Sequence, residues 1–498
     1  MTTPPTRFTV GVELEFIILA LSTDDPDPHE AQKEQLPPVL RIPAETVDDE
    51  YDTGWQNSFF AQEKVKDLLM ANGFPVDNPP LGTRPRSLTS RRIREYESYE
   101  VKLDSSIEEC DTRGYRITRM EIPTPVQFES PDAYRAISYM IDLLCSSYRI
   151  IVNPSCGLHV HVGNSKAEHM SLAHIKRLSS LLWAADPLLA MLHSPRRQQS
   201  VMCKSIRYLT RLSRGDSVTC DHDDPEGFPG MIFDCNRYIG TDVRFGEESP
   251  LWHEEHKDPE TIDAFGETRK PGCYAPFFED STDNGGTRND LADNIPSSVA
   301  TKTTDAKNPS RAYSPPRRRK HRRFRLRNLT EEQMQKYREE NEKYSIITKR
   351  LEDPEPQDPG VFEGVKRIFD SSSSCQIQKS LDPGLRANYN FANYCCTDMC
   401  FNNAEMRRTV EWREADGTFN AQWVVTWARI AVSLTRFAVY SPVFQFLEVL
   451  ALCNEAMNED GKYDVIDLLD ALGLFAEAEF VEERLAKLAE EYSLEYVD

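Results

Sequence analysis

Apolar and polar residues alternate in four segments of the chain, and this period of two is typical of strands with one buried face. The segments are TVGVELEF, YRITRMEIP, SCGLHVHVG and TVEWREADGT. In the first, the valines, leucine and phenylalanine share one face, and Glu13 and Glu15 lie on the other. Each segment predicts a strand with an apolar face for a core and a second face bearing Glu, His or Arg. Strands are expected at 8–20, 99–107, 115–122, 149–163 and 410–413.

Apolar residues that recur every three or four positions predict helices between these strands. Residues 130–145 begin with Ser-Pro-Asp, a helix start signal, and 423–437 have the spacing of a buried helix face. Further helices are expected at 61–73, 167–192, 194–212, 464–474 and 477–492. The pattern predicts an α+β fold, with an antiparallel sheet as the floor of an active site and helices packed behind it.

From about Thr241 to Asp382 the chain is rich in Pro, Gly, Ser, Asn, Asp and Arg and has few apolar periodicities. We expect one domain formed by residues 1–240 and 383–498. A polar, partly disordered insertion at 241–382 would interrupt it, with a helix only at 331–351. Its basic run PPRRRKHRRFRLR, at 315–327, is interpreted as a solvated linker, a nuclear localisation signal or a nucleic-acid patch.

The charge balance limits the partners of the 498-residue chain. It has 59 Lys and Arg against 81 Asp and Glu, a net charge of −22, which argues against non-specific binding to nucleic acid or anionic lipid. The longest apolar stretch is interrupted by Arg429, Arg436 and Glu448, so no membrane helix is expected. No secretory signal and no CxxC spacing occur, which favours a cytoplasmic protein with reduced thiols.

The charged strand faces are the main functional signal. A solvated face is the simplest interpretation, but solvated faces also use Lys, Thr, Ser and Gln, whereas these four strands carry mainly Glu, His and Arg. Two glutamates on one face repel each other unless a cation lies between them. Carboxylates with Mg²⁺ or Mn²⁺, and arginines for nucleotide phosphates, are the interpretation that we favour. Zinc bound by His159, His161 and a carboxylate is the competing one.

The four segments, in this order, resemble the amidoligase family of fungi and bacteria. That family is similar to the carboxylate–amine ligases, which include glutamine synthetase and glutamate–cysteine ligase. The resemblance covers about 8–240 and 385–480, and it implies a glutamine-synthetase-like sheet as the active-site floor. It further implies an ATP- and Mg²⁺-dependent ligase: a carboxylate attacks the γ-phosphate of ATP, and an amine then displaces phosphate from the acyl phosphate. The implied partners are small-molecule or peptide carboxylates and amines.

The resemblance also implies roles for individual residues. The implied metal ligands are Glu13, Glu15, Glu121, His159 and Glu411. Arg413 would steady the transferring phosphoryl group, Asp104 would orient or deprotonate the amine, and His161 would assist beside His159. Arg197, Arg386 and Arg413 are the candidate contacts to the phosphates of ATP. Because no P-loop and no GxGxxG motif occur, side chains and metal ions would have to hold the nucleotide.

Two alternatives remain beside the ligase. A non-catalytic binding protein would keep the ligase fold and use the charged cleft or the insertion for a partner. A zinc-dependent hydrolase would use the His-x-His strand at His159 and His161. Nucleotide binding separates the first interpretation from the other two, and zinc content identifies the hydrolase.

Overall fold

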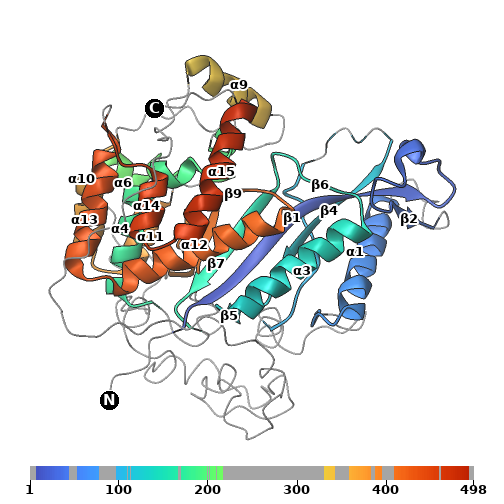
Figure 1. Ribbon diagram of the computed structural model, residues 1–498, viewed down its shortest axis with the longest axis horizontal. Coiled ribbons are helices and arrows are strands. Elements are labelled where there is room, and N and C mark those ends of the chain that lie inside the picture. Colours follow the sequence, from blue (N-terminus) through green and yellow to red (C-terminus); the bar gives the residue numbers. More distant parts are fainter. Residues whose placement is uncertain are drawn as a thin grey trace, which may run out of the picture.

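The first predicted strand is the centre of the fold in the computed structural model (Figure 1). The structure describes residues 7–43, 53–77, 97–108, 110, 112, 114–165, 170–198, 200, 202–208, 210–216, 330–342, 358–382, 387–394, 409–458 and 461–492. Strand β1 (Thr9–Ser22) alternates in sequence as expected, and all but one of its residues are buried. Five other strands pair directly with it, so β1 organises the whole sheet.

The described strands form one nine-stranded sheet whose main path has the order β3-β4-β1-β7-β9-β8. On this path β1 lies between β4 (Arg116–Pro123) and β7 (Gly157–Gly163), and the outer strands are β3 (Lys102–Leu103), β9 (Thr409–Asp416) and β8 (Tyr389–Asn390). Strands β2 (Leu40–Ile42), β5 (Gln127–Phe128) and β6 (Ile150–Ile151) also pair with β1. Only β2 runs parallel to its partner among the described strands. The predicted α+β class with an antiparallel sheet is confirmed.

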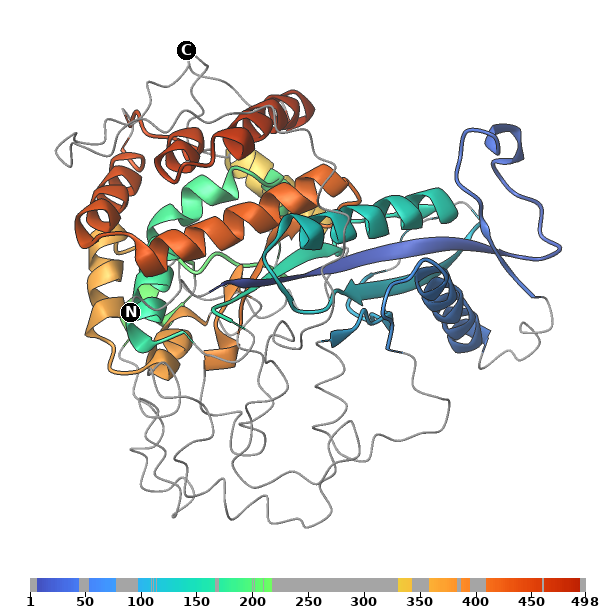
Figure 2. The same cartoon turned by 60° about the horizontal axis from the view of Figure 1, so that its bottom comes forward.

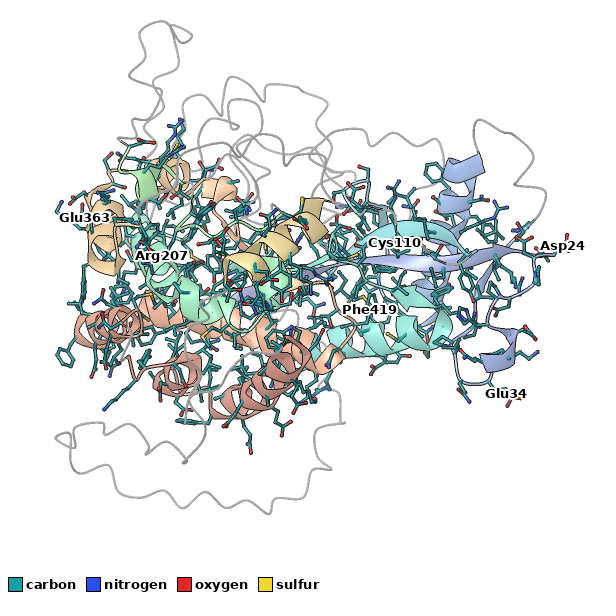
Figure 3. All side chains as sticks on the ribbon, turned by 90° about the horizontal axis from the view of Figure 1, so that it is seen from above. Asp24, Glu34, Cys110, Arg207, Glu363 and Phe419 are labelled. Carbon is teal, nitrogen blue, oxygen red and sulfur yellow. The ribbon has the colours of Figure 1, made fainter. Side chains whose placement is uncertain are left out.

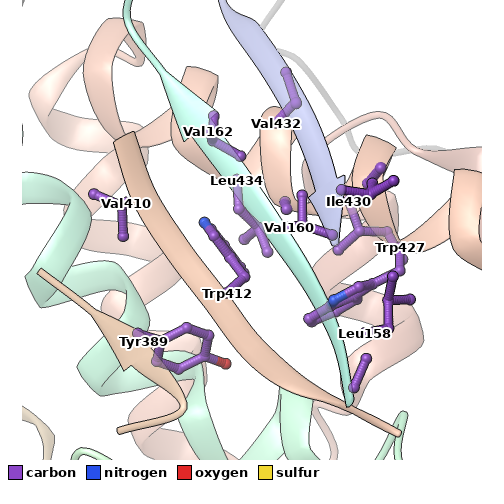
Figure 4. Packing of buried hydrophobic residues seen from close by; sticks show 14 of the residues in the cluster. Leu158, Val160, Val162, Tyr389, Val410, Trp412, Trp427, Ile430, Val432 and Leu434 are labelled. Carbon is purple, nitrogen blue, oxygen red and sulfur yellow. The ribbon is translucent and has the colours of Figure 1, made fainter. Parts of the chain in front are cut away.

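One face of the sheet is apolar because the alternating residues of adjacent strands are in register. Val12 lies opposite Val160, and Val160 lies opposite Trp412 on the next strand. Figure 4 shows this layer of side chains beside those of α12, including Trp427 and Ile430. These residues are buried and belong to the main core of the molecule.

Helices α3 (Pro131–Ser147) and α12 (Ala421–Tyr440) lie along this apolar side (Figure 2). Each begins at a side-chain cap: Ser130 accepts the Ala133 N–H, and Asn420 accepts the Trp423 N–H. Such caps satisfy backbone donors that have no partner within the helix. The two helices therefore start where the sequence signals indicate and bury their apolar faces against the sheet and each other.

The other described helices surround this layer. They are α1 (Thr53–Ala71), α4 (Leu172–Ala190), α5 (Pro195–Gln198), α6 (Arg211–Arg214), α9 (Glu331–Glu342), α13 (Val443–Glu455), α14 (Val465–Ala471), α15 (Phe475–Tyr492), η1 (Glu30–Gln32) and η7 (Ala392–Tyr394). None of the placed helices is long and apolar enough to cross a membrane.

The expectation of helix only at 331–351 within the polar stretch is wrong. Helices α10 (Val361–Asp370) and α11 (Ser374–Leu381) also lie there, and both pack against α4. Figure 3 places Glu363 of α10 at the same end of the molecule as Arg207, whose side chain pairs with Asp358 at 2.6 Å. Trp183 of α4 donates to the Gly360 carbonyl. The basic run 315–327 lies outside the described residues.

The expected helix at 194–212 is also wrong, because only α5 and α6 form there. Between them, the Ile206 N–H donates to the side chain of Asn388, and the Lys204 carbonyl accepts the Asn388 N–H. These bonds take the backbone groups that a continuous helix would use. The strand expected at 149–163 is similarly divided into β6 and β7 by a turn in which Asn153 accepts the Ser155 N–H. Only Lys102–Leu103 is strand within the segment expected at 99–107.

Candidate functional site

The register of three strands brings four charged residues together on the face opposite the core. Glu13 of β1 pairs with His159 of β7, and Gly11, two residues earlier, pairs with His161. His161 in turn lies opposite Glu411 of β9. Alternation within each strand predicts the shared face, and the register adds which residues become neighbours.

The carboxylates and imidazoles of this first group are in contact. His161 Nε2 lies 2.9 Å from Glu13 Oε1, and His159 Nδ1 lies 3.1 Å from Glu13 Oε2. His159 Nδ1 is also 3.5 Å from Glu411 Oε1. One ligand atom from each of Glu13, His161 and Glu411 lies within 4.8 Å of the others. All four side chains are buried, so their charges act on one another with little screening.

Neighbouring polar groups hold Glu411 and His161 in place. Arg413 Nη1 donates to Glu411 Oε1, and Asn390 Nδ2 donates to Glu411 Oε2 at 2.8 Å. Thr409 Oγ1 lies 3.2 Å from His161 Nδ1. The contact of His161 Nδ1 with Thr409 fixes the direction of the ring, so that Nε2 faces Glu13.

Both glutamates of the first group are held in the ionised form. Burial acts to raise the pKa of Glu13, but the imidazoles of His161 and His159 outweigh burial and hold it well below its usual value. Burial also acts to raise the pKa of Glu411, and Arg413, with help from both histidines, lowers it to about 2. Two buried carboxylates therefore carry charge at neutral pH on one sheet face.

A second acidic group lies on the same face, toward β4. Ligand atoms of Glu15, Asp104 and Glu121 come within 4.8 Å of one another. The Gly157 N–H donates to Glu15 Oε2 at 2.7 Å. Burial, followed by the charge of Glu13, raises the pKa of Glu121 to about 8, even though Lys102 acts to lower it. A proton or a cation is therefore needed to balance this group near neutral pH.

Both groups open into one cavity of about 510 Å³. Its lining contains Glu13, Glu15, Asp104, Glu121, His159, Glu411 and Arg413 from the predicted site. The remaining polar lining includes Lys102, Ser106, Gln378, Asp382 and Asn390. Seven of the ten predicted site residues thus line a single cavity of the volume usual for a small-molecule site. His161 does not line the cavity itself, but it contacts Glu13, which does.

The first group fits a divalent cation. Carboxylate oxygens and an imidazole nitrogen are ligands for Mg²⁺, Mn²⁺ and Zn²⁺ alike. His161 Nε2 is buried near Glu13, yet it is not aligned for a hydrogen bond with any described atom. A cation bound between Glu13, His161 and Glu411 would give this buried nitrogen a partner. The excess of carboxylates over imidazoles in the two groups matches a hard ion better than zinc.

The two remaining arginine candidates do not join the cavity in the described residues. Arg197 is buried, and its guanidinium donates to the carbonyl of Arg413 at 2.9 Å and approaches that of Cys156 at 3.5 Å. It therefore ties the end of β9 to β7 from α5. Arg386 lies outside the described residues, so its predicted contact to phosphate stays a prediction.

Three polar residues of the site were not predicted from the sequence. Lys102 is two residues before Asp104 in the alternating segment YEVKLDSS, so the same period of two could have placed it on the site face. Thr409 also shares a strand face with Glu411. Asn390 lies on the two-residue strand β8, which carries no periodicity to detect.

Comparison with known proteins gives one match. Residues 6–219 match the family model described as "Putative amidoligase enzyme". The matched segment contains β1, β4 and β7 and hence Glu13, Glu15, Asp104, Glu121, His159 and His161. No curated protein and no solved structure gives a significant match.

Proposed function

Starting from the match of residues 6–219 to an amidoligase family, a ligase-type enzyme family, we propose that this chain is a carboxylate–amine ligase that depends on ATP and Mg²⁺ or Mn²⁺. One observation carries the proposal. Two clusters of possible metal ligands, Glu13–His161–Glu411 and Glu15–Asp104–Glu121, lie beside Arg413 on one sheet face, and all of them except His161 line one cavity. Transfer of a phosphoryl group needs neutralised charge and alignment more than covalent help from the protein, and cations held by these carboxylates, together with Arg413, would supply both.

The first step of the proposed reaction is attack of a substrate carboxylate oxygen on the γ-phosphorus of ATP, which releases ADP and gives an acyl phosphate. Glu13, Glu411 and His161 would hold a cation, with Glu15 and Glu121 as ligands of a second. Such cations supply positive charge to the phosphate oxygens. Arg413 lines the cavity and would direct its guanidinium at the transferring phosphoryl group, for which planar multiple donors are suited.

In the second step, an amine nitrogen attacks the acyl carbon, phosphate leaves, and the nitrogen gives up a proton. Asp104 lines the same cavity and would accept that proton. The Ser106 N–H donates to Asp104 Oδ1 at 2.7 Å, which fixes the direction of its carboxylate. The sheet floor closes one side of the cavity, which helps to keep water from the acyl phosphate.

Trapping the acyl phosphate tests the proposal. Purified protein is incubated with ATP, Mg²⁺, hydroxylamine and pools of amino acids and peptides, and hydroxamate and ADP are measured. Hydroxylamine displaces phosphate from an acyl phosphate and so reports the first step whatever the natural amine is. We expect ADP and hydroxamate in equal amounts, both lost with EDTA and in Glu411→Gln. The matched control is Glu448→Gln, which alters an exposed carboxylate on α13.

The same material decides between the proposal and its alternatives. Failure to bind an ATP analogue with Mg²⁺ by calorimetry, in a protein that binds the metal alone, would favour the binding protein. Stoichiometric zinc in the purified protein, with no nucleotide binding, would favour the hydrolase. The geometry favours the ligase over the hydrolase. The two ring nitrogens of His159 face Glu13 and Glu15, and they do not point with His161 to one shared position, as two histidine ligands of a zinc ion would.

We also propose a cytoplasmic location, with nuclear import through the basic run 315–327 as the alternative. A fluorescent fusion of the full chain, compared with one in which the arginines of the run are replaced by glutamine, distinguishes the two.

A further inference from the structure

Asn388 lies just outside the cavity. Its hydrogen bonds connect its own segment with three others, which are α4, residues 204–206 and β9. Its backbone N–H donates to the Lys204 carbonyl at 2.8 Å, and its carbonyl accepts the Arg413 N–H at 2.7 Å. Its side-chain oxygen accepts the Ile206 N–H at 3.0 Å. Its side-chain NH₂ donates to Asp186 of α4 at 2.5 Å. Asn388 is buried and does not line the cavity.

The same side chain also acts to lower the pKa of Glu414, a second buried carboxyl group close to Asp186. Ser205 donates to the other oxygen of Asp186 at 2.6 Å, and the Tyr389 hydroxyl donates to Glu414 at 2.5 Å. Burial raises the pKa of Glu414 well above its usual value, and the neighbouring Asp186 adds to this effect. Removing the donor between two buried acids is costly, because neither has water to replace it.

The polar cluster of Asn388, Asp186, Ser205, Tyr389 and Glu414 adjoins the residues that hold Glu411 in the candidate metal site. Asn390, two residues beyond Asn388 on β8, donates to Glu411 Oε2, and Arg413 donates to Glu411 Oε1. The Arg413 N–H is bonded to the Asn388 carbonyl. Tyr389, between the two asparagines, packs on Trp412 with ring centroids 5.2 Å apart, on the core side of the sheet (Figure 4). Strand β8 is only two residues long, so its own ladder cannot fix its position.

We infer that Asn388 is a positioning residue that fixes β8 against β9, so that Asn390 and Arg413 both reach Glu411. The inference rests on the proposed function, because it assigns Asn388 to the metal site of that function. The buried acids, Asn388 and the segment 204–206 form a support for groups that hold the metal ligand. Such supporting groups change metal affinity about 10- to 100-fold when they are altered.

Titration with Mn²⁺ tests this role without requiring a substrate. Free Mn²⁺ is followed by electron paramagnetic resonance in wild type, Asn388→Asp, Asn390→Ala and the double variant. Asn388→Asp keeps the size of the side chain and replaces the donating NH₂ with an oxygen that faces Asp186 and Glu414. We expect the affinity for Mn²⁺ to fall at least about tenfold in Asn388→Asp. The double variant should lose less than the product of the two single effects, because both act on Glu411.

A matched control separates positioning from general loss of stability. Ile368→Ala removes a buried side chain from α10, and it should lower the melting temperature while leaving the affinity for Mn²⁺ unchanged. An unchanged affinity in a folded Asn388→Asp would overturn the inference while the metal site stands. No binding of Mn²⁺ by wild type would overturn the proposed function itself. Should Asn388→Asp not fold, Asn388→Ser, which keeps a short polar side chain, carries the same test.

Discussion

Glu15 and Glu121 are directly paired across β1 and β4, so two carboxylates face each other in the ladder. Like charges in this position destabilise a sheet. Burial and the nearby glutamates raise the pKa of Glu121 to about 8, with burial the larger cause. The pair is therefore a strained element of the apo protein that binding of a cation, or of a proton, would relieve.

The first prediction is that Glu121→Gln flattens the pH dependence of stability. Because the pKa of Glu121 is higher in the folded state than in the unfolded state, folding binds a proton between about pH 5 and pH 8. Wild type should then lose stability as the pH rises through this window, by up to about 1.4 kcal/mol per pH unit. Urea unfolding in EDTA at several pH values measures the effect.

Glu448→Gln is the control for that measurement, because it removes an exposed carboxylate from α13. It should leave the slope of wild type unchanged. Parallel curves for wild type and Glu121→Gln would show that Glu121 titrates normally in the folded protein.

The second prediction concerns Gly157, which allows two side chains to approach the strand. A Cβ at this position would lie 2.7 Å from Arg197 Nη2 and 2.8 Å from His159 Nε2. Neither neighbour can move freely, since Arg197 is bonded to the Arg413 carbonyl and His159 is buried among glutamates. Gly157→Ala should destabilise the protein by about 1–3 kcal/mol. It should also weaken Mn²⁺ binding, which calorimetry and thermal unfolding measure.

Gly11→Ala provides the comparison on the neighbouring strand. Its added Cβ would meet no atom closer than 3.7 Å, an ordinary contact. This variant should keep the stability of wild type. Equal losses in both variants would mean that overlap with Arg197 and His159 is not the reason that Gly157 is needed.

The site face was predictable because alternation is a local property of the sequence. The period of two placed Glu13 with Glu15 and His159 with His161, and the structure keeps both pairs on one face. Which strands become neighbours depends on contacts between segments far apart, such as β7 with β9. The contacts of Asn390 and of Arg197 arise only from that packing, so no local sequence pattern predicts them.

The composition of the polar stretch conceals a helix that belongs to the core. Half of the residues of helix α10 are apolar, but the helix is preceded by EDPEPQDPG and followed by SSSS, so the average composition of the stretch conceals it. Its apolar residues are nevertheless placed on one side, where Val361 and Ile368 are buried against the core. A short helix needs only one such side to become part of a domain.

The third prediction follows from that packing. Ile368→Ala should destabilise the protein by about 2–5 kcal/mol, as expected for a fully buried isoleucine. Phe362→Ala, in the same helix, removes a side chain that is 53% exposed and should change stability by less than about 0.5 kcal/mol. Urea unfolding of both variants measures these changes in stability. If Ile368→Ala is as stable as wild type, α10 is not part of the folding unit.

The last prediction tests whether Arg413 takes part in phosphoryl transfer, as distinct from metal binding. Arg413→Lys keeps a positive charge near Glu411 but loses the planar group with several donors. The affinity for Mn²⁺ should fall far less than the rate, because lysine keeps one donor for Glu411 and the ligands Glu13, Glu411 and His161 are unchanged. The rate of hydroxamate formation should fall about 100-fold or more, as when one donor to a transition-state charge is removed. Arg436→Lys, at an exposed pair with Glu129, should leave both quantities unchanged. If Arg413→Lys retains the full rate while Glu411→Gln is inactive, then Arg413 holds Glu411 in place and takes no part in phosphoryl transfer.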